Sequence, residues 1–107
     1  MADFVADPLK DLQEWYSSHC DGRWEHQYGV SIGTLDNPGW HFRVELTDTE
    51  LFDRPFNEIS VEEKEEKKWY VCRLGNHTFE GFCGPHQLNE VITIFLNWAN
   101  GDAKSAR

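Results

Sequence analysis

The alternation of apolar and polar residues from 40 to 46 is the feature of this sequence that most restricts its fold. Four apolar residues alternate there with three polar ones, namely Trp40, Phe42, Val44 and Leu46 with His41, Arg43 and Glu45. A period of two places the apolar side chains on one face of a β-strand and the polar side chains on the other. Such a strand belongs in a sheet that is covered on one side and wet on the other, as antiparallel sheets commonly are.

Further segments have the pattern of strands and turns. Asp36-Asn37-Pro38-Gly39 is a turn sequence, because proline presets one backbone angle and glycine accepts a positive φ, so it predicts a β-hairpin. The charged run from 62 to 68 is typical of a solvated connection, and Gly75-Asn76 is a turn-forming pair. The other predicted strands cover residues 28–33, 56–62 (with Ile59 and Val61 facing inward), 69–74 and 78–82.

Two segments have helical spacing. Asp7-Pro8 is a helix start and Gly22 a stop, so the first helix is predicted over about 8–20. Gly84-Pro85 opens the second helix, and Gly101 ends it. The apolar stripes of the two helices are Leu9, Leu12, Trp15, Tyr16 and His19, and then Leu88, Val91, Ile92, Phe95, Leu96 and Ala99.

These elements predict an α+β fold. We expect an antiparallel sheet of four to five strands, with an N-terminal and a C-terminal helix packed on one face, because the two helical stripes match one apolar sheet layer. The 107 residues are enough for one domain, spanning 1–107, with an ordered core over about 7–100. Residues 102–107 have nothing to bury and are predicted to be a frayed tail.

The charge balance excludes several classes of function. Nineteen acidic residues against ten basic ones give a net charge of −9. Without clustered Lys and Arg, the chain is not expected to bind nucleic acid or an anionic membrane, whereas an acidic surface favours solubility and encounter with basic partners. No stretch has the roughly 20 apolar residues of a membrane span, and the first residues do not resemble a secretory signal. Three unrelated cysteines then fit a reducing, cytoplasmic setting.

Two kinds of chemical site were weighed against a binding role. His19-Cys20 and Cys83-x-x-His86 could supply zinc ligands, but the chain has no Cys-x-x-Cys pair, so no metal or cofactor is expected. Cys83 precedes a predicted helix start, where the thiol pKa would be lowered, and His86 could act as its base. A small cysteine-dependent enzyme or sulfur carrier is therefore the alternative hypothesis, although the longer parallel fold and glycine-rich loop of such enzymes are missing.

A family resemblance rests mainly on residues 21–40. Trp24-Glu25-His26 followed by the turn Asp36-Asn37-Pro38-Gly39-Trp40, and later Phe79-Glu80-Gly81-Phe82 before the last helix, is similar to the immunity protein 53 family. The similarity covers about residues 8–99. It implies a bacterial cytoplasmic protein of polymorphic toxin systems that neutralises a cognate toxin domain and is not an enzyme.

The acidic composition agrees with such a role. Many intracellular toxins act on nucleic acids and are basic around their active sites, so an acidic inhibitor of a nuclease-like toxin can occupy that site in place of phosphates. We expect stoichiometric occlusion, with carboxylates replacing substrate contacts and aromatic residues as anchors. Trp24 could instead cap the edge of the core, and the sequence does not indicate an oligomeric state. The candidate toxin-binding residues are Trp24, Glu25, His26, Asp36, Asn37 and Glu45.

Overall fold

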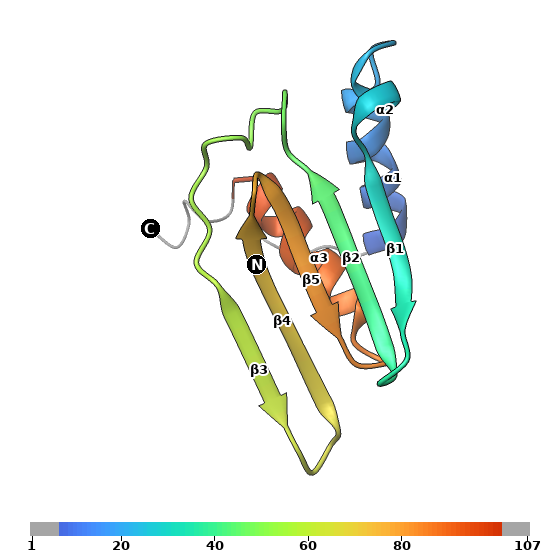
Figure 1. Cartoon of the computed structure of the whole chain (residues 1–107), viewed down its shortest axis with the longest axis vertical. Coiled ribbons are helices and arrows are strands. Elements are labelled where there is room, and N and C mark those ends of the chain that lie inside the picture. Colours follow the sequence, from blue (N-terminus) through green and yellow to red (C-terminus); the bar gives the residue numbers. More distant parts are fainter. Residues whose placement is uncertain (1–6, 102–107) are drawn as a thin grey trace.

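A computed structural model describes residues 7–101 and shows an α+β fold, which confirms the predicted class (Figure 1). The five strands form one antiparallel sheet in the order β1-β2-β5-β4-β3. Along the chain the elements are α1 (Pro8–His19), α2 (Trp24–Gln27), β1 (Val30–Leu35), β2 (Gly39–Glu45), β3 (Ile59–Glu63), β4 (Lys68–Gly75), β5 (Thr78–Cys83) and α3 (Leu88–Ala99).

The strand order follows from one long connection. After the β1–β2 hairpin, residues 46–58 carry the chain to the far edge of the sheet, where β3 begins (Figure 1). The meander β3-β4-β5 then returns, and β5 pairs with β2 in the centre. In this register Phe42 faces Ile32 on one side and Gly81 on the other.

Both long helices lie behind the sheet in Figure 1 and cover its inner face. α3 packs on the central strands β2 and β5, and α1 packs against α3. Phe42, Phe79 and Phe95 are fully buried where the layers meet, and the rings of Phe79 and Phe95 are 5.1 Å apart, edge to face. Trp15 joins α1 to this cluster, since its ring is also 5.1 Å from that of Phe95. One aromatic core therefore holds both helices to the sheet.

The connection from 46 to 58 is part of the core although it contains no helix or strand. Its Leu46 and Leu51 are fully buried. Arg54 donates hydrogen bonds to the carbonyl oxygens of Trp98 and Ala99, at 2.7 and 3.3 Å, and so joins the connection to the last turn of α3. The indole N–H of Trp98 donates to the oxygen of Pro55 at 2.9 Å. Sequence periodicity could not show this packing, because the loop has none.

Most predicted boundaries agree with the structure within a few residues. Gly22 and Gly101 have φ of 93° and 87° at the predicted helix ends. The last turn of the meander lies one residue later than expected, since Asn76 and His77 both adopt a positive φ while Gly75 stays in β4. β3 begins at Ile59 instead of 56.

Two predictions about the whole chain are not tested by the structure. The prediction of a frayed tail at 102–107 lies outside the described residues, and the single domain stays a prediction. Within 7–101, no helix is long and apolar enough to cross a membrane.

Candidate functional site

The six predicted toxin-binding residues lie at opposite ends of the β1–β2 hairpin. Trp24, Glu25 and His26 form α2 and lie near Glu45, whereas Asp36 and Asn37 form the hairpin turn. The seven residues of β2 separate these ends by about 20 Å, at about 3.3 Å per residue. The structure therefore does not bring the six residues into one cluster.

Trp24 belongs to the core. Only 4% of its surface is exposed, and its indole N–H donates to the carbonyl oxygen of Thr47 at 2.9 Å. Its ring packs edge-on against Trp15 at 6.0 Å. The interpretation of Trp24 as a cap on the core edge fits these contacts, and its use as an exposed anchor for a partner does not.

The two predicted residues that follow Trp24 differ in their hydrogen bonds and in their exposure. The carboxylate of Glu25 accepts hydrogen bonds from the backbone N–H groups of Asp21 and Gly22, at 2.9 and 2.8 Å. The backbone N–H of Glu25 itself and those of Asp21 and Gly22 stabilise the carboxylate and so lower the pKa of Glu25. Glu25 thus closes the connection between α1 and α2, and of the three predicted residues here His26 is the exposed one.

The two ends are joined by the open face, which we define as the sheet surface turned away from the helices. Its polar stripe on β2 consists of His41, Arg43 and Glu45, as predicted from the alternation. Glu80 on β5 lies between two arginines, 3.6 Å from Arg43 and 3.0 Å from Arg73. The carboxylate of Glu45 accepts from the backbone N–H of Gly29 at 3.1 Å. Charges on this face are therefore largely paired.

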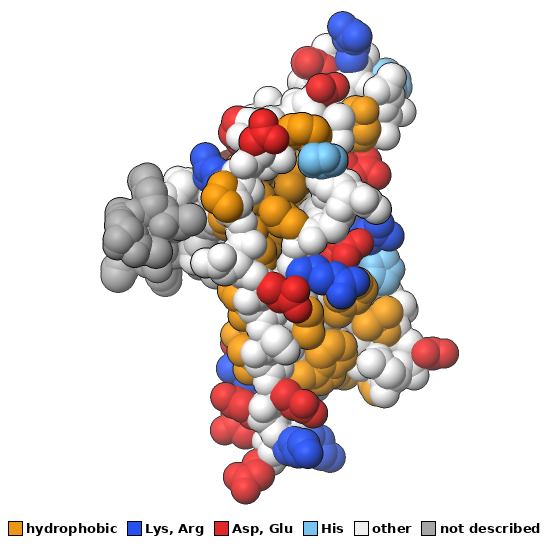
Figure 2. All heavy atoms as spheres, turned by 60° about the vertical axis from the view of Figure 1, so that its left-hand side comes forward, with side chains coloured by type: hydrophobic (Ala, Val, Ile, Leu, Met, Phe, Trp, Pro, Cys, Tyr) orange, Lys and Arg blue, Asp and Glu red, His pale blue; other side chains and the backbone are white. Residues whose placement is uncertain are grey.

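The open face also carries half-buried apolar side chains that the sequence analysis did not select. The register places Phe82 beside His41 and Val71, and the guanidinium of Arg73 lies 5.3 Å above the ring of Phe82. Figure 2 shows hydrophobic side chains on the sheet above the charged tip of the molecule. The signal was present, because Trp69, Val71 and Phe82 are apolar although each pairs with a polar residue of a neighbouring strand, namely Glu62, Ser60 and His41.

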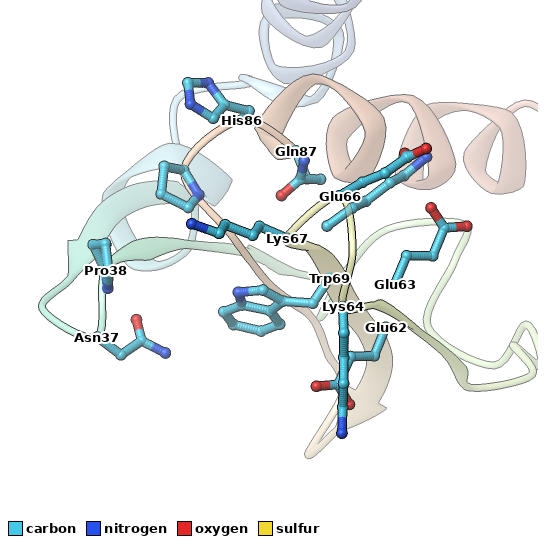
Figure 3. Close-up of a pocket in the computed structure, with 12 residues that line it drawn as sticks. Asn37, Pro38, Glu62, Glu63, Lys64, Glu66, Lys67, Trp69, His86 and Gln87 are labelled. Carbon is cyan, nitrogen blue, oxygen red and sulfur yellow. The ribbon is translucent and has the colours of Figure 1, made fainter.

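A hollow of about 530 Å³ opens where three connections meet at the lower end of the sheet (Figure 3). We call it the turn-end hollow. Asn37 is the one predicted binding residue in its lining, and it also borders a second hollow of about 310 Å³ that continues over Val71. The lining comprises Asn37 and Pro38, then Glu62, Glu63, Lys64, Glu66, Lys67, Lys68 and Trp69, and finally Pro85, His86 and Gln87.

A more acidic groove of about 470 Å³ separates α1 from the end of α3. Asp11, Glu14 and Glu50 line it, and no Lys or Arg is among its lining residues within the described part of the chain. His19 crosses its floor, with Nδ1 2.8 Å from the carbonyl oxygen of Trp15 and Nε2 2.8 Å from Oε1 of Glu50. This groove, with three carboxylates in its lining, is thus away from the hairpin.

The geometry does not favour the cysteine-enzyme hypothesis. Cys83 is 1% exposed on the inner face, and burial raises the pKa of its thiol to about 11. A nucleophilic cysteine needs the opposite shift, because the thiolate is the reactive form. His86 is exposed in the next loop. Among residues 7–101, no three His, Cys, Asp or Glu side chains gather in a way that could hold a metal ion.

Comparison with protein families gives one match. The sequence model of the family described as Immunity protein 53 matches residues 9–100. The chain belongs to this family. No curated protein and no solved structure matches it significantly. The match includes every helix and strand described above except Pro8, the first residue of α1, so it extends well beyond residues 21–40.

Proposed function

We propose that this immunity protein binds a cognate toxin domain and neutralises it by stoichiometric occlusion with an acidic surface. The family match over residues 9–100 carries the proposal. Two further observations support it: the net charge of −9 and the buried, protonated state of Cys83, which argues against chemistry at that residue. A basic, nuclease-like toxin is the partner class that this charge would attract at long range.

The proposed contact surface is the open face of the hairpin. It runs from His26 and Glu45 at one end to Asp36 and Asn37 at the other, which are the accessible members of the predicted set. A span of about 20 Å, widened by the neighbouring strands, suits a standard interface of about 800 Å² per partner. Carboxylates at its edges would replace substrate phosphates, while Trp24 supports this surface from inside.

The proposed compartment is the cytoplasm. Cys20, Cys72 and Cys83 are all free thiols, which fits a reducing environment.

The decisive experiment is co-expression with the toxic domain encoded beside this gene. We expect growth to be rescued and a one-to-one complex to form on size-exclusion chromatography. A toxin that stays active and unbound would reject the proposal.

Matched charge reversals then locate the surface. Asp36→Lys in the hairpin turn and Glu14→Lys in the α1–α3 groove change the net charge equally. We expect Asp36→Lys to slow association and weaken the complex, and Glu14→Lys to have a small effect, because like charges at a contact repel. The reverse ranking would move the interface to the groove.

A further inference from the structure

The turn-end hollow contains a buried acceptor without a donor. Gln87 is 8% exposed, and its Oε1 has no hydrogen-bond partner among the described residues. Figure 3 shows this oxygen turned toward the space above Trp69. An unsatisfied buried carbonyl has a free-energy cost that an incoming N–H or O–H group would remove.

The walls around that acceptor are apolar and fixed. Trp69, Pro38 and Pro85 contribute the apolar part of the lining. The indole N–H of Trp40 donates to the oxygen of Pro85 at 3.0 Å, and Gly84 N–H donates to the oxygen of Trp69 at 3.0 Å. Because these bonds already hold the loop in place, a ligand would not have to order it, which favours binding.

Glycine is required beneath this floor. A β carbon at Gly84 would lie 2.6 Å from Oε1 of Gln87 and 3.1 Å from Nε1 of Trp69. The backbone therefore approaches both groups closely, and the acceptor and the indole share one small site.

The position of one lysine in the turn-end hollow disfavours a cationic occupant. Its lining holds three glutamates and three lysines, and Lys68 is paired with Glu90 at 3.1 Å. Figure 3 shows the side chain of Lys67 reaching across the hollow, whereas Glu63 points away from it. The ammonium group of Lys67 would repel a guanidinium. The face of an aromatic ring, by contrast, would attract this ammonium group.

We propose that the turn-end hollow is the anchor pocket for a tyrosine side chain of the toxin domain. The ring would pack against Trp69 and the two prolines, and its hydroxyl would donate to Oε1 of Gln87. Tyrosine is enriched among the residues that dominate binding energy at interfaces. This inference rests on the proposed function, because it names the anchor of the same interface, which Asn37 joins to the hairpin turn.

The first test needs no toxin. N-acetyltyrosinamide, N-acetylphenylalaninamide and N-acetylargininamide would each be titrated into the full-length protein, following the indole Nε1–H signal of Trp69 by NMR. We expect the tyrosine amide to bind most tightly, about five- to tenfold better than the phenylalanine amide, which is the range of one net hydrogen bond. An unshifted Trp69 signal, or equal or tighter binding of the arginine amide, would overturn the inference.

The second test removes the acceptor while keeping its shape. Gln87→Met should abolish the preference for tyrosine over phenylalanine amide and leave phenylalanine amide binding unchanged, so the phenylalanine amide controls for folding. Glu65→Gln, in the same turn but outside the lining, should change neither. A tyrosine preference that persists in Gln87→Met would overturn the role of this oxygen.

The toxin complex gives an independent outcome. We expect Gln87→Met to weaken it about five- to tenfold, by loss of the same hydrogen bond. If the toxin binds the wild-type protein and this variant equally, the anchor is elsewhere although the proposed function stands. If no complex forms at all, the proposed function fails, and the amide titrations still decide whether the pocket takes a phenol.

Discussion

Gly81 lies directly beneath Val91, and this contact sets how closely α3 approaches the sheet. A β carbon on Gly81 would overlap Cγ1 of Val91, and both residues are buried. Gly81 pairs with Phe42 and Cys72 on the inner face, in the middle of the central strand. The missing side chain therefore lets α3 approach the sheet closely at this point.

Replacing this glycine should destabilise the fold. We expect Gly81→Ala to lower the free energy of unfolding by about 1–3 kcal/mol, as overpacking of a close-packed core does. Urea denaturation would measure the change. Gly29→Ala is the matched control, because a β carbon there has no neighbour within 4 Å. Equal effects of the two substitutions would show that Val91 gives way and that the contact is not restrictive.

The pair His19 and Glu50 predicts a pH dependence of stability. Burial alone would raise the pKa of Glu50, but the hydrogen bonds from His19 and from the backbone N–H of Glu50, with the charges of His19 and Arg54, together outweigh it, and the pKa lies below its ordinary value of 4.5. Because the folded pKa is the lower one, the carboxylate stabilises the fold above about pH 4.5 and loses this contribution as the pH falls through the folded pKa.

Urea unfolding of the wild type and of Glu50→Gln checks this. We expect the difference in unfolding free energy between them to shrink as the pH falls below about 4.5. Glu65→Gln, in an exposed turn, should show no such trend. A difference that grows on acidification would contradict the assignment.

The regular elements were predictable because their patterns are local. The alternation around Phe42 specified both the strand and its buried face, and the stripe on α3 specified the helix side that covers it. Trp98 is an exception on α3, since it is buried although it was not assigned to that stripe, and Leu9 and Tyr16 are exceptions on α1, since they are exposed although they were assigned to its stripe. Its indole reaches Pro55 in a loop distant in sequence, which helical periodicity does not indicate.

The site was harder to predict than the fold because it depends on which turns meet. Asn37 in the hairpin turn, Trp69 near the start of β4 and Pro85 in the connection to α3 are far apart in sequence, and the strand order brings them to one end of the sheet. Without that order, Trp69 had no reason to be placed beside the hairpin turn. Trp24 was selected for its polar neighbours, yet Asp21 and Glu25 use their carboxylates to close the local backbone and leave the indole buried.

Trp24 should therefore matter for stability and not for contact with the toxin. Trp24→Phe keeps a ring but loses the hydrogen bond to Thr47, so we expect a loss of about 1–3 kcal/mol in unfolding free energy. Toxin affinity, measured well below the melting temperature, should stay at the wild-type value. A variant that folds normally yet binds the toxin much more weakly would place Trp24 in the interface after all.

The three thiols should differ sharply in reactivity. Burial raises the pKa of Cys72 to about 12 and that of Cys83 to about 11, whereas Cys20 is half-buried at the end of α1. Since alkylation requires the thiolate, iodoacetamide near neutral pH should modify Cys20 alone in the folded protein and all three thiols in denaturant.

Mass spectrometry of peptides would identify the labelled sites, with Cys20→Ser as the control that removes native labelling. The protein labelled at Cys20 should still neutralise its toxin, because Cys20 lies away from the open face. Its thiol contacts the carbonyl oxygen of Tyr16, at 3.3 Å, within the end of α1. Rapid labelling of Cys83 in the folded state, accompanied by loss of neutralisation, would instead revive a cysteine-dependent mechanism. The pKa of about 11 argues against that result, because at neutral pH only about one thiol in 10⁴ would be ionised.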